Sequence, residues 1–595
     1  MCLVAGGLLA TIDLRSLAER YVSHKLQRNL SIGAIDIKWS IPLSLELRDL
    51  RLANATWGSE PDMVRIERVS VRIELSALLH GVLRYRELKL VSPYILLEHK
   101  PDEGNWRFGS RGSQSKGGLA IVPKDRTQFP TLVNFGVTDG EIVYRTAAGF
   151  VLRLKFSDLA ISSRGEDQPV SVSAKGFYNK TPVELQAKTD SFSALRNSSV
   201  PFGAALSVSA GSGRADFHGT MTEPLDFDGL NGRLEVDIRD LDEFAAMFGS
   251  RSPSDTPVTL AGSFDRGGDR WGLSSATGKI ADSRLDAKLV LIEGRHDRAD
   301  QISVELNSRE VDLKRLLDRR SKAGSDANSG ELSLDLGQKR DAIVDARVTA
   351  QQVVFGRTRM ADFKMHARLA PGEATLGQLR FRLAGGTIES SANVNDIAGG
   401  SHLVARTSLS GIEIGDIAQL IGTKPRQIAG QLYGGFDLEM TGNTLGDALR
   451  SSKSHAVIVM TQGQVARTLV EQASSDLRAL FRKGEGTTQL TCLLAVLDLH
   501  DGVGTISPLR LKTEEATLLG GGKINLLEKR VNLTLRSDPS STSLFSLDVP
   551  LQISGGLSEL SVKPTHGSPP DQANKSLTDL PQPLRELAAQ NPCLR

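Results

Sequence analysis

The chain has 595 residues, with 72 basic and 70 acidic side chains and a formal net charge of +2. This balance provides no global field that would attract nucleic acid. Aromatic residues make up only 5% of the chain, too few for a surface on which bases stack. We therefore expect no nucleic-acid partner, while the length allows several domains or one long repeat array.

The three cysteines, Cys2, Cys492 and Cys593, offer neither a disulfide framework nor the spacing of a metal site. Cys492 lies in an apolar run, so we predict that it is a small buried hydrophobic residue. So few cysteines are compatible with the cytoplasm and with the periplasm, and the redox compartment stays open.

The first twelve residues, MCLVAGGLLATI, are apolar but too short for a membrane span of about 20 residues. They also lack the positive start and the clear cleavage site of a signal peptide. Two interpretations stay open: the end of a transmembrane anchor, or the start of a buried strand or helix. In the first, the candidate anchor residues are Leu3, Val4, Leu8, Leu9 and Ile12.

A helix is predicted over about residues 13–29, across the open end of the first sheet. Asp13 is a suitable N-cap, and apolar residues follow at helical spacing through Leu14, Leu17, Tyr21 and Val22. From Ser31 the apolar period switches to two, which predicts β-strands.

Alternating segments fill residues 31–108 and resume through residues 125–410, where their irregular spacing indicates a degenerate repeat. Between them, residues 109–124 are rich in Ser and Gly and predict a flexible loop. Short helices are predicted at Leu241–Phe248, Val311–Arg319 and Thr444–Ser451.

Residues Thr491–Lys563 predict an antiparallel meander with one apolar face, and an amphipathic helix is predicted before it at Ala466–Arg482. The turns of the meander are predicted at Asp501-Gly502, Gly520-Gly521-Gly522 and Gly555-Gly556.

The tail, residues 566–595, is rich in Pro and polar residues. We predict that it is disordered, apart from a short helix at Pro583–Gln590.

Both ends of the chain carry a set of characteristic segments. The N-terminal set consists of Leu45–Leu52, Leu78–Gly81, Ser92-Pro93 and Gly104-Asn105-Trp106. The C-terminal set consists of Cys492, Asp501–Val503, Gly521–Leu526, Val531–Leu535, Pro550 and Gly555. In these segments both ends of the chain resemble the AsmA-like family, which is related to bridge-like lipid transfer proteins. The usual aromatic residue before the Asp-Gly turn is absent, and Leu497 or Leu499 stands there.

The resemblance implies a mainly β fold, an elongated and curled antiparallel sheet with a groove. It divides the chain into a membrane-anchor end with its helix (1–30), an N-terminal β region (31–108), the loop (109–124), a middle (125–410), a C-terminal β region (411–565) and the tail (566–595). It also favours the anchor interpretation of the first residues, with one inner-membrane helix and the bulk in the periplasm.

Enzyme motifs are lacking: the chain has no His-Glu-x-x-His, no phosphate-binding Gly-Lys-Ser/Thr loop and no Gly-x-Ser-x-Gly elbow. His24, His99, His218 and His455 have no metal-like companions in sequence, and Asp62, Glu223, Asp226 and Asp228 lack the acidic spacing of a calcium loop. We expect no catalysis, no metal and no cofactor.

The strands do offer an extended aliphatic face. Such a lining favours acyl chains, by about 0.8 kcal/mol per buried methylene, whereas an ordinary sandwich would bury the same face internally. The candidate groove residues are Val69, Val71, Ile73, Leu75, Leu234, Val236, Ile238, Leu509, Leu511, Ile524, Leu526, Val531, Leu533, Leu535, Leu551 and Ile553.

By resemblance, we expect an inner-membrane-anchored periplasmic protein of a Gram-negative bacterium that supports outer-membrane biogenesis by conducting phospholipid. Its partners would be phospholipid, the inner membrane, and outer-membrane or periplasmic proteins. The alternative is a non-transporting scaffold or regulator of outer-membrane protein assembly. A secreted β-repeat adhesin is disfavoured by the anchor-like start.

Overall fold

The structure is a computed structural model. It forms two compact units, which are described separately: unit 1 (residues 1–299 and 315–320) and unit 2 (residues 300–314 and 321–595). The described residues are 13–74, 76, 84–100, 103–106, 126–145, 151–247, 255–294, 298–317, 342–398, 400–416, 428–467, 486–514, 516–538, 550–556, 559–566 and 575–594.

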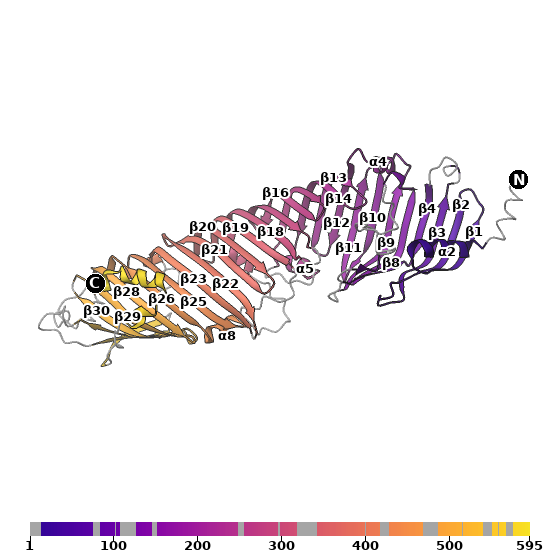
Figure 1. The fold of residues 1–595 in the computed structure, drawn as a ribbon. Coiled ribbons are helices and arrows are strands. Elements are labelled where there is room, and N and C mark those ends of the chain that lie inside the picture. Colours follow the sequence, from indigo (N-terminus) through magenta and orange to yellow (C-terminus); the bar gives the residue numbers. More distant parts are fainter. Residues whose placement is uncertain are drawn as a thin grey trace. The chain divides into compact units, whose positions relative to one another are not determined.

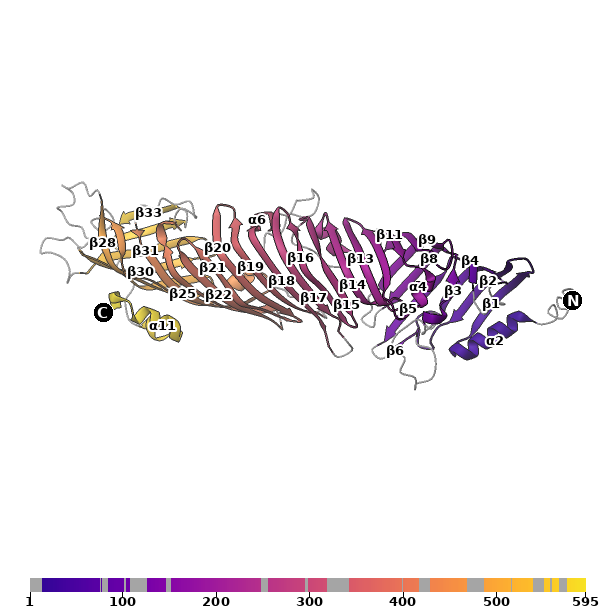
Figure 2. The ribbon, with the colours of Figure 1, turned by 90° about the horizontal axis from the view of Figure 1, so that it is seen from above.

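Both units are mainly β, with few helices, as predicted (Figures 1 and 2). The strands of unit 1 are β1 (Leu30–Lys38), β2 (Leu43–Ala53), β3 (Asp62–Ile73), β4 (Arg84–Val91), β5 (Tyr94–Lys100), β6 (Glu103–Gly104), β7 (Thr131–Leu132), β8 (Asn134–Arg145), β9 (Val151–Ser163), β10 (Val170–Tyr178), β11 (Thr181–Thr189), β12 (Phe202–Ala210), β13 (Gly213–Glu223), β14 (Asp228–Ile238), β15 (Val258–Gly267), β16 (Arg270–Ile280) and β17 (Ser283–Ile292). Its helices are α2 (Leu14–Leu26), η1 (Arg126–Gln128), α4 (Phe192–Arg196) and α5 (Leu241–Ala246).

Unit 2 is also built mainly of antiparallel strands. Its strands are β18 (Asp300–Asp312), β19 (Ala342–Phe355), β20 (Thr358–Ala370), β21 (Glu373–Leu383), β22 (Gly386–Ile397), β23 (Gly400–Glu413), β24 (Ile428–Ala429), β25 (Gln431–Gly442), β26 (Lys453–Met460), β27 (Gly463–Ala466), β28 (Thr487–His500), β29 (Val503–Thr513), β30 (Thr517–Asn525), β31 (Arg530–Ser537), β32 (Leu551–Gly556) and β33 (Glu559–Pro564). Its helices are α8 (Leu445–Arg450), α10 (Lys575–Thr578), α11 (Gln582–Ala589) and η4 (Pro592–Leu594). Helix α6 (Leu313–Leu317) directly follows β18, and its residues 313–314 belong to unit 2 and 315–317 to unit 1.

Within each unit, the neighbouring strands that the structure describes pair antiparallel, except at two places. In unit 1, β4 and β5 form successive parts of one position in the sheet, since β3 pairs with both, and they run parallel to β7 and β8. In unit 2, β18 runs parallel to β19. Parallel neighbours need a crossover connection rather than a tight turn, and long segments do separate the strands at both places.

A line of left-handed residues crosses the first strands of unit 1. Asp49 (φ 49°), Ser92 (φ 49°) and Asp139 (φ 54°) fall on one row across β2, β3, the β4–β5 position and β8. Each shifts the strand alternation by one residue, so Leu47 and Leu50 contact the same core cluster although they are an odd number of positions, three, apart in the sequence. Aspartate tolerates this conformation better than most residues.

Helix α2 lies against the free edge of β1. Its span, Leu14–Leu26, confirms the helix that was predicted over about residues 13–29. The Asp13 carboxylate caps it by accepting from Ser16 N–H at 3.2 Å, and Ala18, Val22 and Leu26 pack on the cluster around Ile32. The Ile32 N–H donates to Glu19 Oε1 at 2.8 Å, which holds the pKa of that carboxyl below its usual value.

The Gly104-Asn105-Trp106 motif has a structural role, because its hydrogen bonds link two segments of unit 1. Asn105, fully buried, accepts from the Glu98 N–H at 2.9 Å and donates to Leu96 O at 2.8 Å and to Asn54 Oδ1 at 2.9 Å. Trp106 packs against the same cluster as Ile32. The motif therefore ties β5 to the segment that follows β2.

Three sequence-based predictions need correction or fall outside the description. Gly520, Gly521 and Gly522 lie inside β30 rather than in a turn, where a Cβ on Gly520 would meet Leu535 Cδ2 at 2.2 Å. Asp501-Gly502 does form a turn, with φ of 51° and 79°. Residues 109–124 and all but the first two residues of the predicted helix at Ala466–Arg482 lie outside the described residues, and Ala466 ends β27.

Candidate lipid-contact face

A row of apolar residues crosses unit 1 on one face of its sheet, from β2 to β17. Directly paired residues point to the same face, so the register defines the row. Its members are Leu47, Val69, Leu90, Val137, Leu159, Ala174, Leu185, Val208, Ala215, Val236, Leu260, Gly278 and Leu285. Of the predicted groove residues in this unit, Val69, Val71, Ile73, Leu234, Val236 and Ile238 all belong to this face.

The opposite face of the same strands is polar. The adjacent row, from β9 to β17, consists of Asp158, Lys175, Glu184, Ser209, Arg214, Asp237, Thr259, Lys279 and Arg284. Ion pairs join parts of it, such as Lys175 Nζ with Glu184 Oε1 at 3.5 Å. The sheet of unit 1 thus has one aliphatic face and one charged face.

Unit 2 has an equivalent apolar face. One row runs through Phe436, Ala456, Leu497, Ile506, Gly522, Leu533 and Ile553. A second runs through Leu409, Gly434, Ile458, Ala495, Leu509, Gly520, Leu535 and Leu551. Leu511, Ile524 and Val531 share this face, Leu526 follows β30 in a turn, and Leu75 lies outside the described residues.

The apolar face is only partly buried over most strands. In β11 the inward residues Val183, Leu185 and Ala187 are half-buried, while the outward residues are exposed. The inward Leu234 and Val236 of β14 are half-buried as well. A second sheet packed on this face would bury these positions fully. The described residues therefore leave an extended apolar surface partly open, and such surfaces mark interaction sites.

Strand β28 differs because its outer face is also apolar over Leu494 and Val496 and is covered. Its residues alternate mainly between buried and exposed or half-buried. On the outer face, Val457, Val459, Leu494 and Val496 form a cluster with Leu580, Leu584 and Ala588. Figure 2 shows α11 lying along this side of the unit 2 sheet. The apolar run Leu493–Leu497 is uninterrupted because Leu494 and Val496 are buried on the outer face, while Leu493, Ala495 and Leu497 are half-buried.

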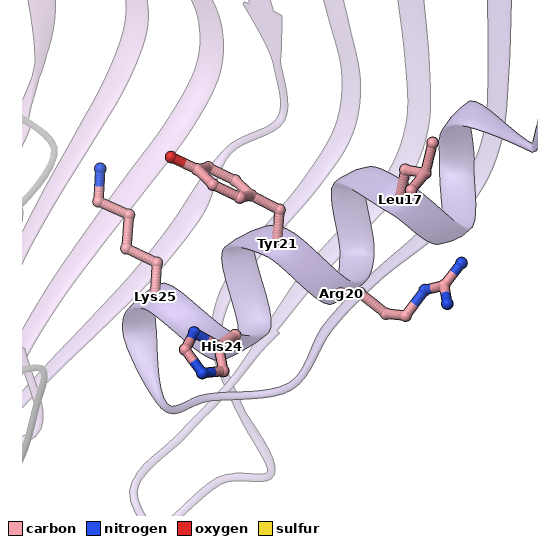
Figure 3. Close-up of a pocket in the computed structure, with 5 residues that line it drawn as sticks. All are labelled: Leu17, Arg20, Tyr21, His24 and Lys25. Carbon is pink, nitrogen blue, oxygen red and sulfur yellow. The ribbon is translucent and has the colours of Figure 1, made fainter.

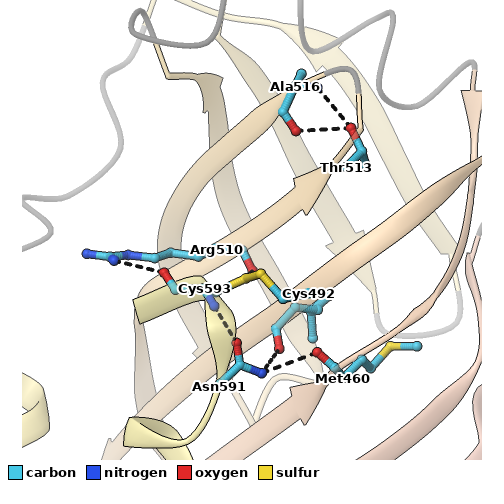
Figure 4. The surroundings of a disulfide bond; sticks show 8 residues. Met460, Cys492, Arg510, Thr513, Ala516, Asn591 and Cys593 are labelled. Carbon is cyan, nitrogen blue, oxygen red and sulfur yellow. Dashed lines mark hydrogen bonds between the residues drawn. A yellow bond between two sulfur atoms is a disulfide. The ribbon is translucent and has the colours of Figure 1, made fainter. Parts of the chain in front are cut away.

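A disulfide fastens the C-terminal segment to β28 (Figure 4). Cys492 and Cys593 are joined with a Cα–Cα distance of 5.7 Å. Beside the bond, the Asn591 amide donates to Met460 O at 3.2 Å and to Leu493 O at 3.0 Å, and Arg510 donates to Cys593 O at 3.0 Å. We call residues 575–594 the C-terminal clasp.

Two predictions about this region were wrong. Cys492 is buried, as expected, but it is half of a disulfide rather than an isolated hydrophobic residue. The tail is ordered over residues 575–594, where α11 confirms the predicted helix at Pro583–Gln590. The prediction of disorder rested on the proline and polar residues of the tail. The helical spacing of Leu580, Leu584 and Ala588 is the signal in the sequence for an apolar helix face that packs on the sheet.

Other candidate sites find no support within the described part of the chain. No group of three or more His, Cys, Asp or Glu residues there could hold a metal ion. Asp228 instead accepts from the Gly229 and Gly268 N–H groups, and these hydrogen bonds lower its pKa. No described helix is long and apolar enough to cross a bilayer, and the anchor candidates Leu3, Val4, Leu8, Leu9 and Ile12 lie outside the described residues.

Comparison with known proteins agrees with this fold and these motifs. The model of the AsmA family matches residues 2–126, which include the Leu45–Leu52 and Gly-Asn-Trp segments. The chain is also similar to the AsmA family protein YhjG of Escherichia coli (strain K12), with 23% identity over 93% of this chain and 89% of that protein.

Proposed function

Because this chain is an AsmA-like protein, we propose that it is anchored in the inner membrane, lies mostly in the periplasm and conducts phospholipid along its apolar face. The likeness supports a role in the cell envelope. Lipid conduction toward the outer membrane is the finer proposal, and it needs support from the site itself.

The observation that carries the proposal is the apolar row of unit 1, most of whose members are only half-buried; Val69, Val137, Ala174 and Leu285 are buried. Its members are aliphatic, and few polar groups interrupt it. An aliphatic surface gains about 0.8 kcal/mol for each methylene that it removes from water, but without placed polar groups it neither orients nor selects a ligand. These properties suit passage of acyl chains along the sheet better than capture at one point.

The disulfide supports the location in the periplasm. Disulfides persist in oxidising compartments, including the bacterial periplasm, and are rare in the cytosol. The Cys492–Cys593 bond lies where the clasp meets β28, and Cys492 is fully buried. We propose further that the protein acts without catalysis or a cofactor, and without nucleic acid as a partner.

Detergent-free purification of the full chain, followed by lipid extraction and mass spectrometry, tests the proposal. Wild-type protein is expected to carry phospholipid. The double variant Leu533→Asp/Ile553→Asp places two carboxylates on the apolar face and should lose it. The matched control, Thr534→Asp/Ser554→Asp, changes the other face of the same strands and should retain it.

Folding of each variant is checked by circular dichroism. A folded wild-type chain that carries no phospholipid would contradict conduction and would favour the scaffold or regulator of outer-membrane protein assembly. Equal lipid loss in both double variants would show that the binding does not depend on the apolar face.

A further inference from the structure

Helix α2 blocks strand addition at the β1 edge and leaves a different surface in its place. The Leu30 N–H donates to Ser23 Oγ at 2.9 Å, and Arg15 donates to Gly33 O at 3.0 Å. Together with the Ile32–Glu19 bond, these contacts occupy backbone groups of Leu30, Ile32 and Gly33 that an exposed edge strand would otherwise offer to another strand. Along this part of β1, a partner therefore meets α2 rather than the strand.

The outer face of α2, defined as Leu17, Arg20, Tyr21, His24 and Lys25, points away from β1. At about 100° per residue, Leu17 and His24 lie nearly opposite the Glu19 side chain that binds the edge. These five residues line a shallow surface hollow, and Leu17, Tyr21 and Lys25 project to the same side of the helix (Figure 3). Tyr21 is 68% exposed and Leu17 48% exposed.

The β1–β2 turn, at the end of β1 away from the α2–β1 connection, carries two more exposed apolar side chains, Trp39 at 64% and Ile41 at 94% exposure. Among the described residues, three of the four most exposed large apolar side chains are thus Ile41, Tyr21 and Trp39, the fourth being Phe227 at 65%. Isolated apolar side chains on a surface need no explanation, but their concentration within residues 13–42 does.

The chemistry of this surface matches a bilayer better than a protein. Tryptophan and tyrosine are enriched where membranes meet water, and basic residues are attracted to anionic headgroups. Arg20 and Lys25 form no ion pair with any described residue, so both charges are available. In the sequence, the apolar stretch MCLVAGGLLATI directly precedes α2.

We propose that the outer face of α2, with Trp39 and Ile41, docks on an anionic phospholipid bilayer. The proposal rests on the proposed membrane location and deepens it. Since α2 lies along the edge of β1, docking places the first strands of the apolar face beside the bilayer, where phospholipid would enter or leave.

Quenching of Trp39 fluorescence by brominated phospholipid tests the docking. The full chain is reconstituted in vesicles of brominated phosphatidylcholine and phosphatidylglycerol, and the signal of Trp39→Phe is subtracted to remove quenching of the other three of the four tryptophans. Wild type should show quenching that Trp39→Phe lacks. The control Trp39→Phe/Phe227→Trp carries an equally exposed tryptophan at the β13–β14 turn and should show none beyond Trp39→Phe.

Charge provides the second arm. Each of Arg20→Gln and Lys25→Gln should lower the ratio of docked to undocked protein about fivefold, whereas Lys180→Gln, in the exposed β10–β11 turn, should not change it. On vesicles of phosphatidylcholine alone, the wild-type protein should show a similar fall in the ratio of docked to undocked protein.

Absence of Trp39-specific quenching in anionic vesicles would overturn the docking proposal, and an unchanged ratio in both charge variants would overturn its electrostatic part. Either result would leave the lipid-extraction test unaffected, because that test probes the apolar face and not α2. Failure of docking and failure of conduction are therefore distinguishable.

Discussion

Cys492 in β28 and Cys593 in η4 are covalently joined across a sequence separation of 101 residues. The bond lies under the outer face of the sheet, where the clasp also contributes Leu580, Leu584 and Ala588 to a buried cluster. It makes the clasp an integral part of unit 2, so covalent and apolar contacts should both be needed to hold it.

Replacing Cys593 by serine should release the end of the clasp. The expected loss in free energy of unfolding is about 2–4 kcal/mol. It is measured by urea denaturation of the protein, followed through a signal that reports the unfolding of unit 2. Thiol titration of the unfolded, unreduced wild-type chain should find one free thiol, from Cys2. Three free thiols would disprove the bond in solution, and Cys2→Ser serves as the control that leaves stability unchanged.

Truncating the apolar side of α11 should detach the clasp without touching the disulfide. Leu584 is 5% exposed and packs on the β26–β28 cluster, so Leu584→Ala should cost about 2–5 kcal/mol. Limited proteolysis of the clasp, followed by mass spectrometry, reports its release. Glu586→Ala, on the exposed side of α11, is the control; equal cleavage of both variants would contradict the docked helix.

Acid should weaken unit 1 through Glu98, which is 6% exposed. Burial raises the pKa of this carboxyl, but hydrogen bonds from Ser59 and Asn54 and the charge of Arg145 outweigh burial, and the net pKa is lowered. A lowered folded-state pKa contributes stability above the unfolded value of about 4.3, and this stability is lost as pH falls through the folded pKa.

Glu98→Gln therefore should lower stability near neutral pH, by about 1–3 kcal/mol for the disrupted buried network. It should also flatten the fall in stability toward acid, as followed by urea denaturation at several pH values. Glu67→Gln, at an exposed position of β3, is the matched control. An acid profile unchanged by Glu98→Gln would show that Glu98 has no part in the acid response.

Asp49 should resist replacement by a β-branched residue. Its φ of 49° lies in the left-handed region, which costs ordinary residues roughly 1–2 kcal/mol. Asp49→Val should lower the free energy of unfolding of unit 1 by at least about that amount, whereas Asp49→Gly should be tolerated. Equal stability of the two variants in urea denaturation would show that the left-handed conformation at position 49 does not restrict which residue can stand there.

Much of the fold could be predicted because strand alternation and helix capping are local. Period-two patterns at Leu45–Leu47 and Leu234–Ile238 correctly predicted strands with one apolar face, and Asp13 correctly marked the start of α2. The shift of phase at Asp49 was present in the Leu-x-Leu-x-Asp-Leu-x-Leu segment. Its cause became clear only with the backbone conformation, because a one-residue shift needs a left-handed residue in line with its neighbours.

The sequence by itself determined the class of fold and which side of each strand is apolar, since side-chain direction depends only on a residue's place along its strand. Tertiary structure alone decided the parallel pairing of β18 with β19, the pairing of Cys492 with Cys593, and the docking of α11 on β26 and β28. Each of these joins segments that are separated by a crossover or by about a hundred residues. No local pattern encodes such a contact, because it depends on the path by which the chain returns.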